Sequence, residues 1–192
     1  DDQIGKVSPR QISRAELFAY VESELKAIEN LLPGPRTNEY GRAEQRVVDQ
    51  ALLYIDQEAT LMPGVEHIFQ FFLEKEFKIG LATSSPPALI EWVKDKLGIR
   101  SLIHASCSAQ NLPYAKPHPQ VYLDCANALH ISPLACICFE DSFNGLIAAK
   151  AARMKCVVVP HPDQFNETKW NLADLKLSSL DFANNETLLK LL

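Results

Sequence analysis

Hydrophobic positions follow two different patterns along the chain, and the change between them falls near residue 61. Before this point apolar residues recur at spacings of three and four, which is typical of one face of a helix. They include Leu17, Phe18, Val21, Leu25 and Ile28. After it, short apolar runs alternate with helical segments. The pattern therefore predicts a small helical hairpin over 1–60 and a separate α/β unit over 61–192.

The α/β unit is predicted to alternate helices with buried strands. We expect helices over 65–75, 84–97 and 120–129 and from residue 142 onward. We expect strands over 78–83, 102–105, 135–139 and 156–160, followed by a loop-rich tail over 161–192 that ends in a short helix. Such alternation predicts parallel strands joined by right-handed crossovers, with helices on both faces of the sheet.

Two adjacent carboxylates follow the run Ala135–Phe139, whose residues are apolar without alternation, as in a strand buried on both faces. Glu140 and Asp141 stand where that strand ends, and Ser142 can cap the helix that follows. Buried carboxylates are costly unless a cation meets them, and a hard divalent ion such as Mg²⁺ is the natural candidate. The alternative is a solvated acidic turn.

Other polar residues are expected at the same edge, because such sheets gather their chemistry at the carboxyl ends of the strands. Thr83 and Ser84 end one strand just before a helix, which suits either a phosphate cradle or a plain helix cap. Lys116 lies in a loop stiffened by prolines. It can hold a phosphate or orient a carboxylate, whereas a lone loop lysine is ordinarily only solvated.

Charge and composition narrow the classes of function. A formal net charge of -5 argues against a general nucleic-acid surface, which needs a basic face. No apolar stretch approaches the roughly 20 residues that a membrane helix requires. The five cysteines match no zinc spacing, so we expect reduced thiols and a cytoplasmic protein. We read His118 and His161 as loop residues, because no third ligand stands at metal spacing.

Taken together, these motifs resemble the haloacid dehalogenase (HAD) superfamily, in the branch that contains β-phosphoglucomutase and small sugar-phosphate phosphatases. Leu81–Pro86 is similar to the second family motif, with Thr83 at its phosphate-binding position, and Lys116 matches the third. Phe139–Gly145 resembles the fourth motif, whose acidic residues hold magnesium. The run Leu112–Ala126 is most similar to bacterial 2-deoxyglucose-6-phosphate and hexitol phosphatases.

The resemblance implies a HAD-like Rossmannoid fold, a three-layer parallel α/β core over 61–192 with part of a small helical cap over 1–60. One departure is severe. The first family motif, an apolar strand ending in Asp-x-Asp-Gly, is not found in the sequence. Asp1 and Asp2 follow no strand, and Asp49 and Asp56 fall in predicted helices. We therefore expect the nucleophile and the first, central strand to be missing, as in an N-terminally incomplete family member.

The family reaction implies a role for each matched residue. In it an aspartate attacks phosphorus and forms an aspartyl-phosphate, which water then hydrolyses. Thr83, Ser84 and Lys116 would bind the phosphoryl group, with Lys116 stabilising its charge, and Asp141 with Glu140 would hold Mg²⁺. Without the first motif we expect weak or absent Mg²⁺ binding and no turnover.

The function expected from the resemblance is thus that of a Mg²⁺-dependent phosphatase for small sugar phosphates whose nucleophile is absent from this chain. Two alternatives stay open: a non-catalytic HAD-fold binding protein, and a β-phosphoglucomutase-type phosphotransferase. We expect a monomer that binds a small sugar phosphate or phosphate, with no nucleic-acid or membrane partner.

Overall fold

The computed structural model describes residues 62–188 and 191. The chain divides into two units, Asp1–Ala59 and Thr60–Leu192, and every described residue belongs to the second. The helical cap predicted over 1–60 therefore lies outside the described residues.

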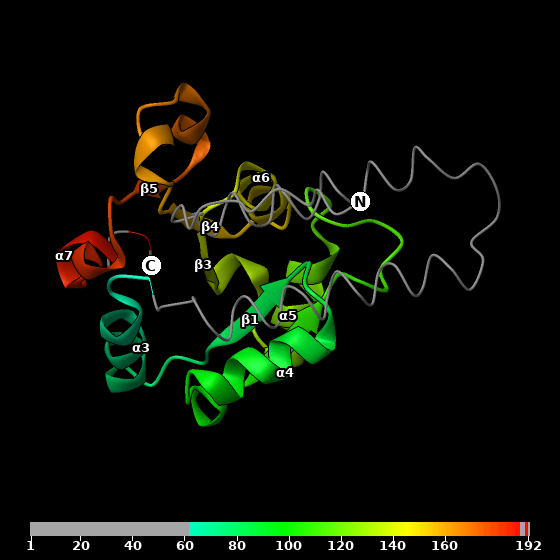
Figure 1. The fold of residues 1–192 in the computed structure, drawn as a ribbon. Helices are drawn as coiled ribbons and strands as arrows, with labels where there is room; N and C mark the ends of the chain where they lie inside the picture. Colours follow the sequence, from blue (N-terminus) through cyan, green and yellow to red (C-terminus); the bar gives the residue numbers. More distant parts are fainter. Residues whose placement is uncertain (1–61, 189–190, 192) are drawn as a thin grey trace, which may run out of the picture. The chain divides into compact units, whose positions relative to one another are not determined.

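Helices and strands alternate along the second unit, as predicted (Figure 1). The helices are α3 (Val65–Glu74), α4 (Pro87–Lys96), α5 (Gln120–Leu129), α6 (Phe143–Ala151) and α7 (Asn185–Leu188). The strands are β1 (Gly80–Thr83), β2 (Ala105–Ser108), β3 (Ile137–Glu140), β4 (Lys155–Val158) and β5 (Leu175–Lys176). Short 3-10 helices fill several connections: η1 (Arg100–Leu102), η2 (Pro133–Ala135), η3 (Pro162–Gln164), η4 (Thr168–Leu172) and η5 (Leu180–Phe182).

Every strand pair among the described residues is parallel, which confirms the predicted class of fold. The strands form two sheets, β1–β2 and β3–β4–β5, rather than one continuous sheet. In the first sheet Thr83 lies opposite Ser108, and in the second Glu140 lies opposite Val158. Within this part of the chain β1 and β3 do not pair with each other, so the sheet is divided where the resemblance places the missing strand.

Alternate residues of β1 point their backbone N–H and C=O groups toward the edge that faces away from β2. The carbonyls of Ile79 and Thr83 accept hydrogen bonds from the β2 side, both at 2.8 Å. In a parallel strand, alternate residues bond toward opposite edges, so Gly80 and Ala82 direct their backbone groups to the other edge. No described strand pairs with that edge.

The edge of β3 that faces away from β4 has the same character. The carbonyls of Cys136 and Glu140 accept bonds from the β4 side at 3.1 and 2.8 Å. Ile137 and Phe139 therefore direct their backbone groups to the opposite edge, which no described strand occupies. β1 and β3 thus each keep one edge that another parallel strand can join.

Several strand assignments from the sequence need correction. β1 begins at Gly80 rather than at residue 78, and β4 spans Lys155–Val158 rather than 156–160. β2 lies at Ala105–Ser108 rather than 102–105, because Arg100–Leu102 forms a 3-10 turn and pairing with β1 starts only after it. β3 begins two residues later than predicted, because Pro133–Ala135 is also a 3-10 turn. β5 was not predicted: its two residues carry no periodic signal, and only its pairing with β4 defines it.

Side chains alternate across β4, so that it contributes to two hydrophobic cores. Cys156 and Val158 join a core that includes residues of α5 and α6, among them Val121 and Leu146. Val157 joins a second core, whose other buried members are Ile68, Val159, Leu177, Ala183 and Leu188. The β3–β4–β5 sheet therefore has packed side chains on both faces, which is the layered arrangement that the sequence predicted.

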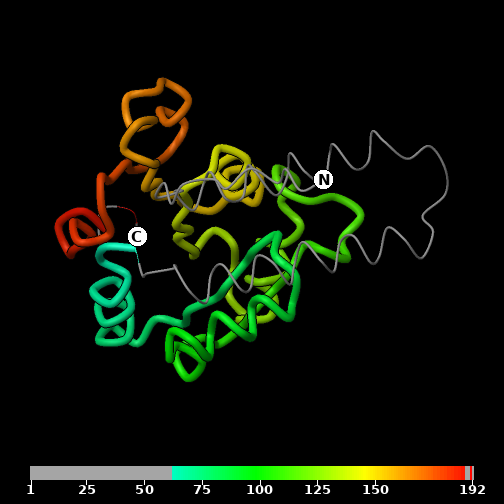
Figure 2. The backbone as a smooth tube through the Cα atoms, in the orientation of Figure 1, coloured from blue at the N-terminus to red at the C-terminus, as the bar shows by residue number. Residues whose placement is uncertain are grey.

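The C-terminal tail returns to α3, as the path of the chain in Figure 2 shows. Ile68 of α3 and Leu188 of α7 belong to one core, and the His67 ring lies 2.7 Å from the carbonyl oxygen of Ala183. The segment predicted as a loop-rich tail with a short helix thus covers one face of the second sheet.

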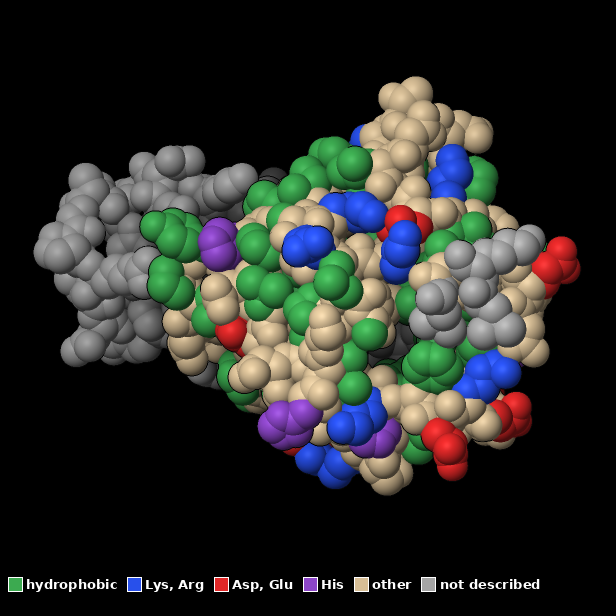
Figure 3. All heavy atoms as spheres, turned by 180° about the vertical axis from the view of Figure 1, so that it is seen from behind, with side chains coloured by type: hydrophobic (Ala, Val, Ile, Leu, Met, Phe, Trp, Pro, Cys, Tyr) green, Lys and Arg blue, Asp and Glu red, His purple; other side chains and the backbone are tan. Residues whose placement is uncertain are grey.

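Charged and apolar side chains are mixed on the surface (Figure 3), and the cysteines carry free thiols. Figure 3 shows one face of the molecule, on which basic and acidic side chains are scattered among apolar ones. None of the described helices is long and apolar enough to cross a membrane. The five cysteines are free, and burial raises the pKa of the Cys125 thiol to about 12, which keeps that thiol protonated.

The Asp174 carboxylate links the start of β5 to the end of α6. Replacing Asp174 is expected to make the free energy of unfolding depend less on pH. Its carboxylate accepts from Lys150 Nζ at 2.6 Å and from the Cys156 backbone N–H at 2.7 Å. Burial by itself raises the pKa of Asp174, but these two donors outweigh it and hold the pKa below its usual range. The charged form therefore stabilises the fold above the unfolded-state pKa of about 3.9, and this stabilisation is lost as pH falls through the lower folded-state value.

We expect Asp174→Asn to lower the free energy of unfolding at pH 7 by about 1–3 kcal/mol, because buried donors lose a charged acceptor. The difference from wild type should shrink steadily below pH 4. Urea unfolding between pH 2.5 and 7 measures both quantities. A deficit that stays constant across this range would contradict the prediction.

Candidate functional site

The polar residues singled out in the sequence lie at the carboxyl ends of β1 and β3. Thr83 ends β1 and Glu140 ends β3. Lys116 reaches them from the loop between β2 and α5. The structure therefore brings together three motifs that are 33 and 24 residues apart in the sequence.

The segment Thr83–Ser85 is held in a defined turn at the end of β1. The Ser85 backbone N–H donates to Thr83 Oγ1 at 3.1 Å, so the hydroxyl acts as an acceptor and keeps its own proton for another partner. Ser108 Oγ, at the end of β2, donates to the Ser85 carbonyl at 2.6 Å. α4 begins after this turn without a side-chain cap, so Ser84 and Ser85 do not serve as its N-cap. Of the two interpretations that the sequence left open, the plain helix cap is therefore not formed.

The Lys116 ammonium joins the two sheets. Its Nζ donates to the Ala82 carbonyl at 3.2 Å, on the edge of β1 that faces away from β2. It donates to Glu140 Oε1 at 2.6 Å, at the end of β3. The third acceptor is the Tyr122 hydroxyl at 3.0 Å. With only 13% of its side chain exposed, Lys116 is not the solvated loop lysine that the sequence left open.

Glu140 is buried and engaged through both carboxylate oxygens. Its side chain is 7% exposed. Oε1 accepts from Lys116 and from the Tyr122 hydroxyl, and Oε2 accepts from Ser142 Oγ at 2.9 Å. Burying a carboxylate is tolerable here because a cation and two hydroxyl donors replace the lost water.

The beginning of α6 is shaped around that carboxylate. Ser142 caps the helix as predicted, since its hydroxyl accepts from the Gly145 backbone N–H at 3.0 Å. Any Cβ at position 145 would overlap the Glu140 carboxylate. Gly145 is therefore required by close approach, and it explains the glycine at the end of the acidic motif.

Asp141 differs from its neighbour, because it is exposed and no protein donor occupies its carboxylate among the hydrogen bonds and ion pairs described. Among residues 62–188 and 191 there is no group of three His, Cys, Asp or Glu side chains that could hold a metal ion. A divalent ion thus fits the described donors in part. Asp141 offers a free carboxylate, whereas both oxygens of Glu140 already accept protein hydrogen bonds.

The sequence missed one member of this cluster. Tyr122 falls within the predicted helix 120–129 and was not singled out, yet its hydroxyl touches both Lys116 and Glu140. Burial, with Cys138 and Glu140 nearby, raises the pKa of Tyr122 far above its usual range, so the phenol stays protonated. No signal in the sequence marks this hydroxyl, because its partners lie on a loop and on another strand.

The two histidines set aside in the sequence stay outside the cluster. His118 Nδ1 accepts from the Gln120 backbone N–H at 3.3 Å, and its ring lies 5.2 Å from that of Tyr114. His161 accepts from the Asp163 backbone N–H at 3.4 Å. Both belong to local turns, as expected for loop residues.

The sequence profile of haloacid dehalogenase-like hydrolases matches residues 4–153. Hexitol phosphatase B of Escherichia coli K12 is 46% identical over 136 residues, which make up 71% of this chain and 61% of the relative. Fructose-1-phosphate phosphatase YqaB of the same organism is 35% identical over 81 residues, 42% of this chain and 43% of the relative. The chain thus spans less than two thirds of each of these curated relatives.

Solved structures show the same fold. β-Phosphoglucomutase from Clostridium difficile superimposes with a TM-score of 0.75 at 24% identity, over 89% of this chain and 75% of that one. CbbY from Rhodobacter sphaeroides, solved in complex with phosphate, gives a TM-score of 0.73 at 20% identity, over 91% and 81% of the two chains. Identities this low establish the architecture alone.

Proposed function

We propose that this chain, which belongs to the haloacid dehalogenase-like hydrolases, carries the phosphate- and metal-binding half of a site that hydrolyses small sugar phosphates. The observation that carries the proposal is the Lys116 ammonium, which donates both to β1, next to Thr83, and to Glu140 on β3. A structural ion pair alone would not require hydroxyls and an exposed carboxylate around the same point. Hydroxyls and an ammonium at the strand ends suit a phosphoryl group, and the exposed carboxylate suits a divalent cation bound beside it.

Each residue has a distinct task in this proposal. The Thr83 hydroxyl accepts from the Ser85 backbone N–H and keeps its own proton, which it donates to a phosphoryl oxygen. Ser84, exposed beside it, donates a second hydrogen bond. Lys116 places a positive charge nearby and lowers the cost of bringing a phosphate dianion close to two carboxylates.

Asp141, together with Glu140, is proposed to hold Mg²⁺ beside the phosphate-binding residues. Bound there, the ion would neutralise phosphoryl charge and withdraw electron density from phosphorus. Asp141 is the residue free to ligate directly, since the Glu140 oxygens already accept from Lys116, Tyr122 and Ser142. Metal binding by this chain alone is expected to be weak, because one free carboxylate is a poor site for a hard divalent ion.

Turnover needs a nucleophile that the 192 residues do not supply. The family motif Asp-x-Asp-Gly is absent from the sequence, so no aspartyl-phosphate can form on its first aspartate. We therefore propose that the chain binds phosphate and is inactive as it stands. Hexitol phosphates and 2-deoxyglucose 6-phosphate are the substrate class proposed for the complete site, supported by 46% identity to hexitol phosphatase B.

Phosphate binding tests the proposal directly. Wild-type chain is expected to bind inorganic phosphate in isothermal titration calorimetry, and Thr83→Val to weaken that binding about 5- to 10-fold through loss of one charge-assisted hydrogen bond. Val keeps the β-branched shape of Thr, so β1 should persist. Thr168→Val, a change at an exposed threonine that begins η4, is the matched control and should leave binding unchanged. Absence of phosphate binding by wild type, or equal binding by Thr83→Val, would refute the proposed site.

A further inference from the structure

We propose that Tyr122 is a positioning residue that holds the Lys116 ammonium at the meeting point of β1 and β3. No motif in the sequence assigns this role to Tyr122. The proposal concerns how the lysine is held, and its relevance to phosphate binding rests on the function proposed above.

The first step concerns the ammonium group itself. A lysine ammonium has three N–H donors. Lys116 has three protein acceptors, the Ala82 carbonyl, the Tyr122 hydroxyl and Glu140 Oε1, at 3.2, 3.0 and 2.6 Å. Each donor therefore has its own partner, and the three acceptors come from β1, α5 and β3. This arrangement defines the position of Nζ in three dimensions, which a single ion pair would not do.

The second step concerns the tyrosine. Tyr122 is buried, at 5% exposure, in the first turn of α5. Its hydroxyl accepts from Lys116 and donates to Glu140 Oε1, so lysine, tyrosine and glutamate form a closed triangle. The Lys116 Nζ also lies 4.7 Å from the centre of the Tyr122 ring. The side chain thus contacts the ammonium through both its hydroxyl and its ring face.

The third step is that the hydroxyl directs both partners at once. The Tyr122 hydroxyl donates its proton to Glu140 and accepts from Lys116 through a lone pair. Displacing Lys116 or Glu140 therefore breaks a hydrogen bond to the tyrosine. Burial raises the pKa of the Tyr122 phenol, so the group itself is neutral. Tyr122 therefore contributes order to the lysine rather than charge to the site.

The exchange of ammonium protons with water reports this order. The 192-residue chain labelled with ¹⁵N-lysine is expected to show a slowly exchanging ε-ammonium signal that disappears in Lys116→Met. Tyr122→Phe keeps the ring and removes one acceptor, and should speed exchange at Lys116 about 2- to 10-fold. Lys150, which donates to Asp174, is the internal control for folding and should exchange equally in both proteins.

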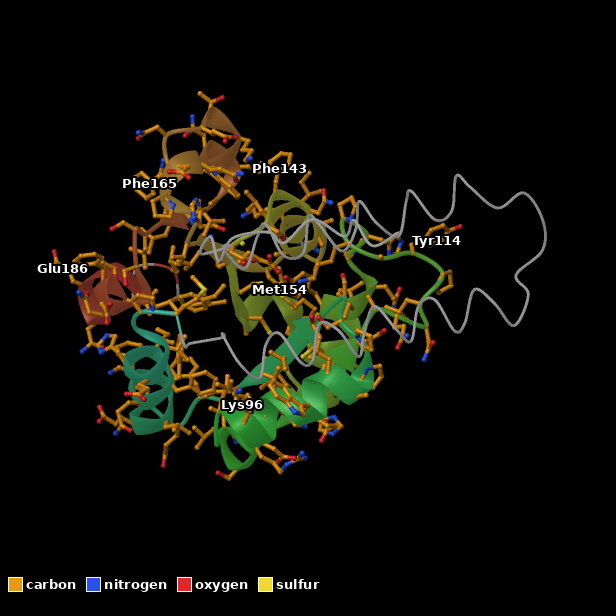
Figure 4. All side chains as sticks on the ribbon, in the orientation of Figure 1. Lys96, Tyr114, Phe143, Met154, Phe165 and Glu186 are labelled. Atoms are coloured by element: carbon orange, nitrogen blue, oxygen red, sulfur yellow. The ribbon has the colours of Figure 1, made fainter. Side chains whose placement is uncertain are left out.

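A tyrosine of the same loop region serves as the matched variant. Tyr114 is 66% exposed and lies on the outer part of the loop between β2 and α5 (Figure 4). Tyr114→Phe is therefore expected to leave Lys116 exchange unchanged. Equal exchange at Lys116 in wild type and Tyr122→Phe would overturn the proposal, and so would the absence of any protected Lys116 signal in wild type.

Two further readouts keep the outcome decisive. In wild type, the Tyr122 hydroxyl proton should show a nuclear Overhauser effect to the Lys116 ammonium, and its absence would overturn the proposal even if Tyr122→Phe failed to fold.

Phosphate titration separates this inference from the proposed function. Tyr122→Phe should weaken phosphate binding about 2- to 5-fold. A chain that protects Lys116 as described but binds no phosphate would refute the proposed function and leave the positioning role of Tyr122 intact.

Discussion

Joining a short apolar strand that ends in Asp-x-Asp-Gly in front of residue 1 is expected to raise Mg²⁺-dependent phosphate release from hexitol phosphates by at least about a thousand-fold. The unmodified chain should release phosphate no faster than the uncatalysed background. A panel of hexitol phosphates, 2-deoxyglucose 6-phosphate and hexose phosphates, assayed for inorganic phosphate, measures the gain and ranks the substrates.

The reason lies in the two strand edges that no described strand joins, although Lys116 Nζ donates to the Ala82 carbonyl on one of them. Gly80 and Ala82 on β1, and Ile137 and Phe139 on β3, direct backbone groups away from their present partners. A parallel strand between β1 and β3 would bond to both and make one continuous sheet. Its carboxyl end would then lie beside Thr83 and Glu140, where the proposed phosphate and metal sites meet.

The matched control is the same added strand with Asn in place of its first aspartate. Asn keeps the size and the hydrogen-bonding shape but is not a nucleophile, so this protein should fold as well and stay inactive. Asp141→Asn in the active fusion should reduce turnover through weaker Mg²⁺ binding. Turnover by the unmodified chain that Asp141→Asn abolishes would contradict the prediction, because it would reveal a nucleophile within the 192 residues.

Lys116→Met is expected to lower the free energy of unfolding by about 3–5 kcal/mol, because it leaves a buried carboxylate without its cation. The Lys116 and Glu140 side chains are only 13% and 7% exposed, so water cannot replace the lost partner. Such a loss is comparable to the whole stability of a marginal domain. Urea unfolding followed by circular dichroism measures it.

A double-mutant cycle separates the ion pair from packing. Glu140→Gln alone should destabilise, since it removes the charge that Lys116 faces. In the Lys116→Met background the same change should be neutral or stabilising, because a neutral amide costs less to bury than an unpaired carboxylate. The coupling energy is expected to be about 1–3 kcal/mol. Additive effects of the two changes would contradict this account.

A surface pair provides the control for the cycle. Lys169 and Glu167 are 2.7 Å apart with side-chain exposures of 29% and 46%. Because water and salt screen such a pair, Glu167→Gln should cost no more than about 1 kcal/mol. A similar cost at both pairs would show that burial is not what makes the Lys116–Glu140 contact strong.

The sequence predicted best where the signal is local. α5 begins and ends at the predicted residues, because its apolar face and the proline before it mark the helix clearly. Ser142 was recognised as a cap from its place before an apolar helix. β2 and β5 were misplaced or missed, because strands of four and two residues are defined by their partners and not by their own periodicity.

By itself, the sequence determined the class of fold and the identity of Thr83, Lys116, Glu140 and Asp141 as the residues to examine. The periodicity of hydrophobic residues, the position of a residue at the end of a strand and the order of the motifs are enough to identify them, because each is read from neighbouring residues. Only the tertiary structure decided that Glu140 is buried and paired while Asp141 is exposed. Adjacent residues at a strand end point in different directions, and the packing of α5 and α6 selects which direction is covered.

The role of Tyr122 also came from tertiary structure alone. In the sequence it is one apolar position on a helix, and its hydroxyl has no local partner to reveal it. The partners lie 6 and 18 residues away, on a loop and on another strand, and only folding brings them within hydrogen-bonding distance. Hydrogen bonds act over about 3 Å, so contacts between distant segments are decided by how the elements pack.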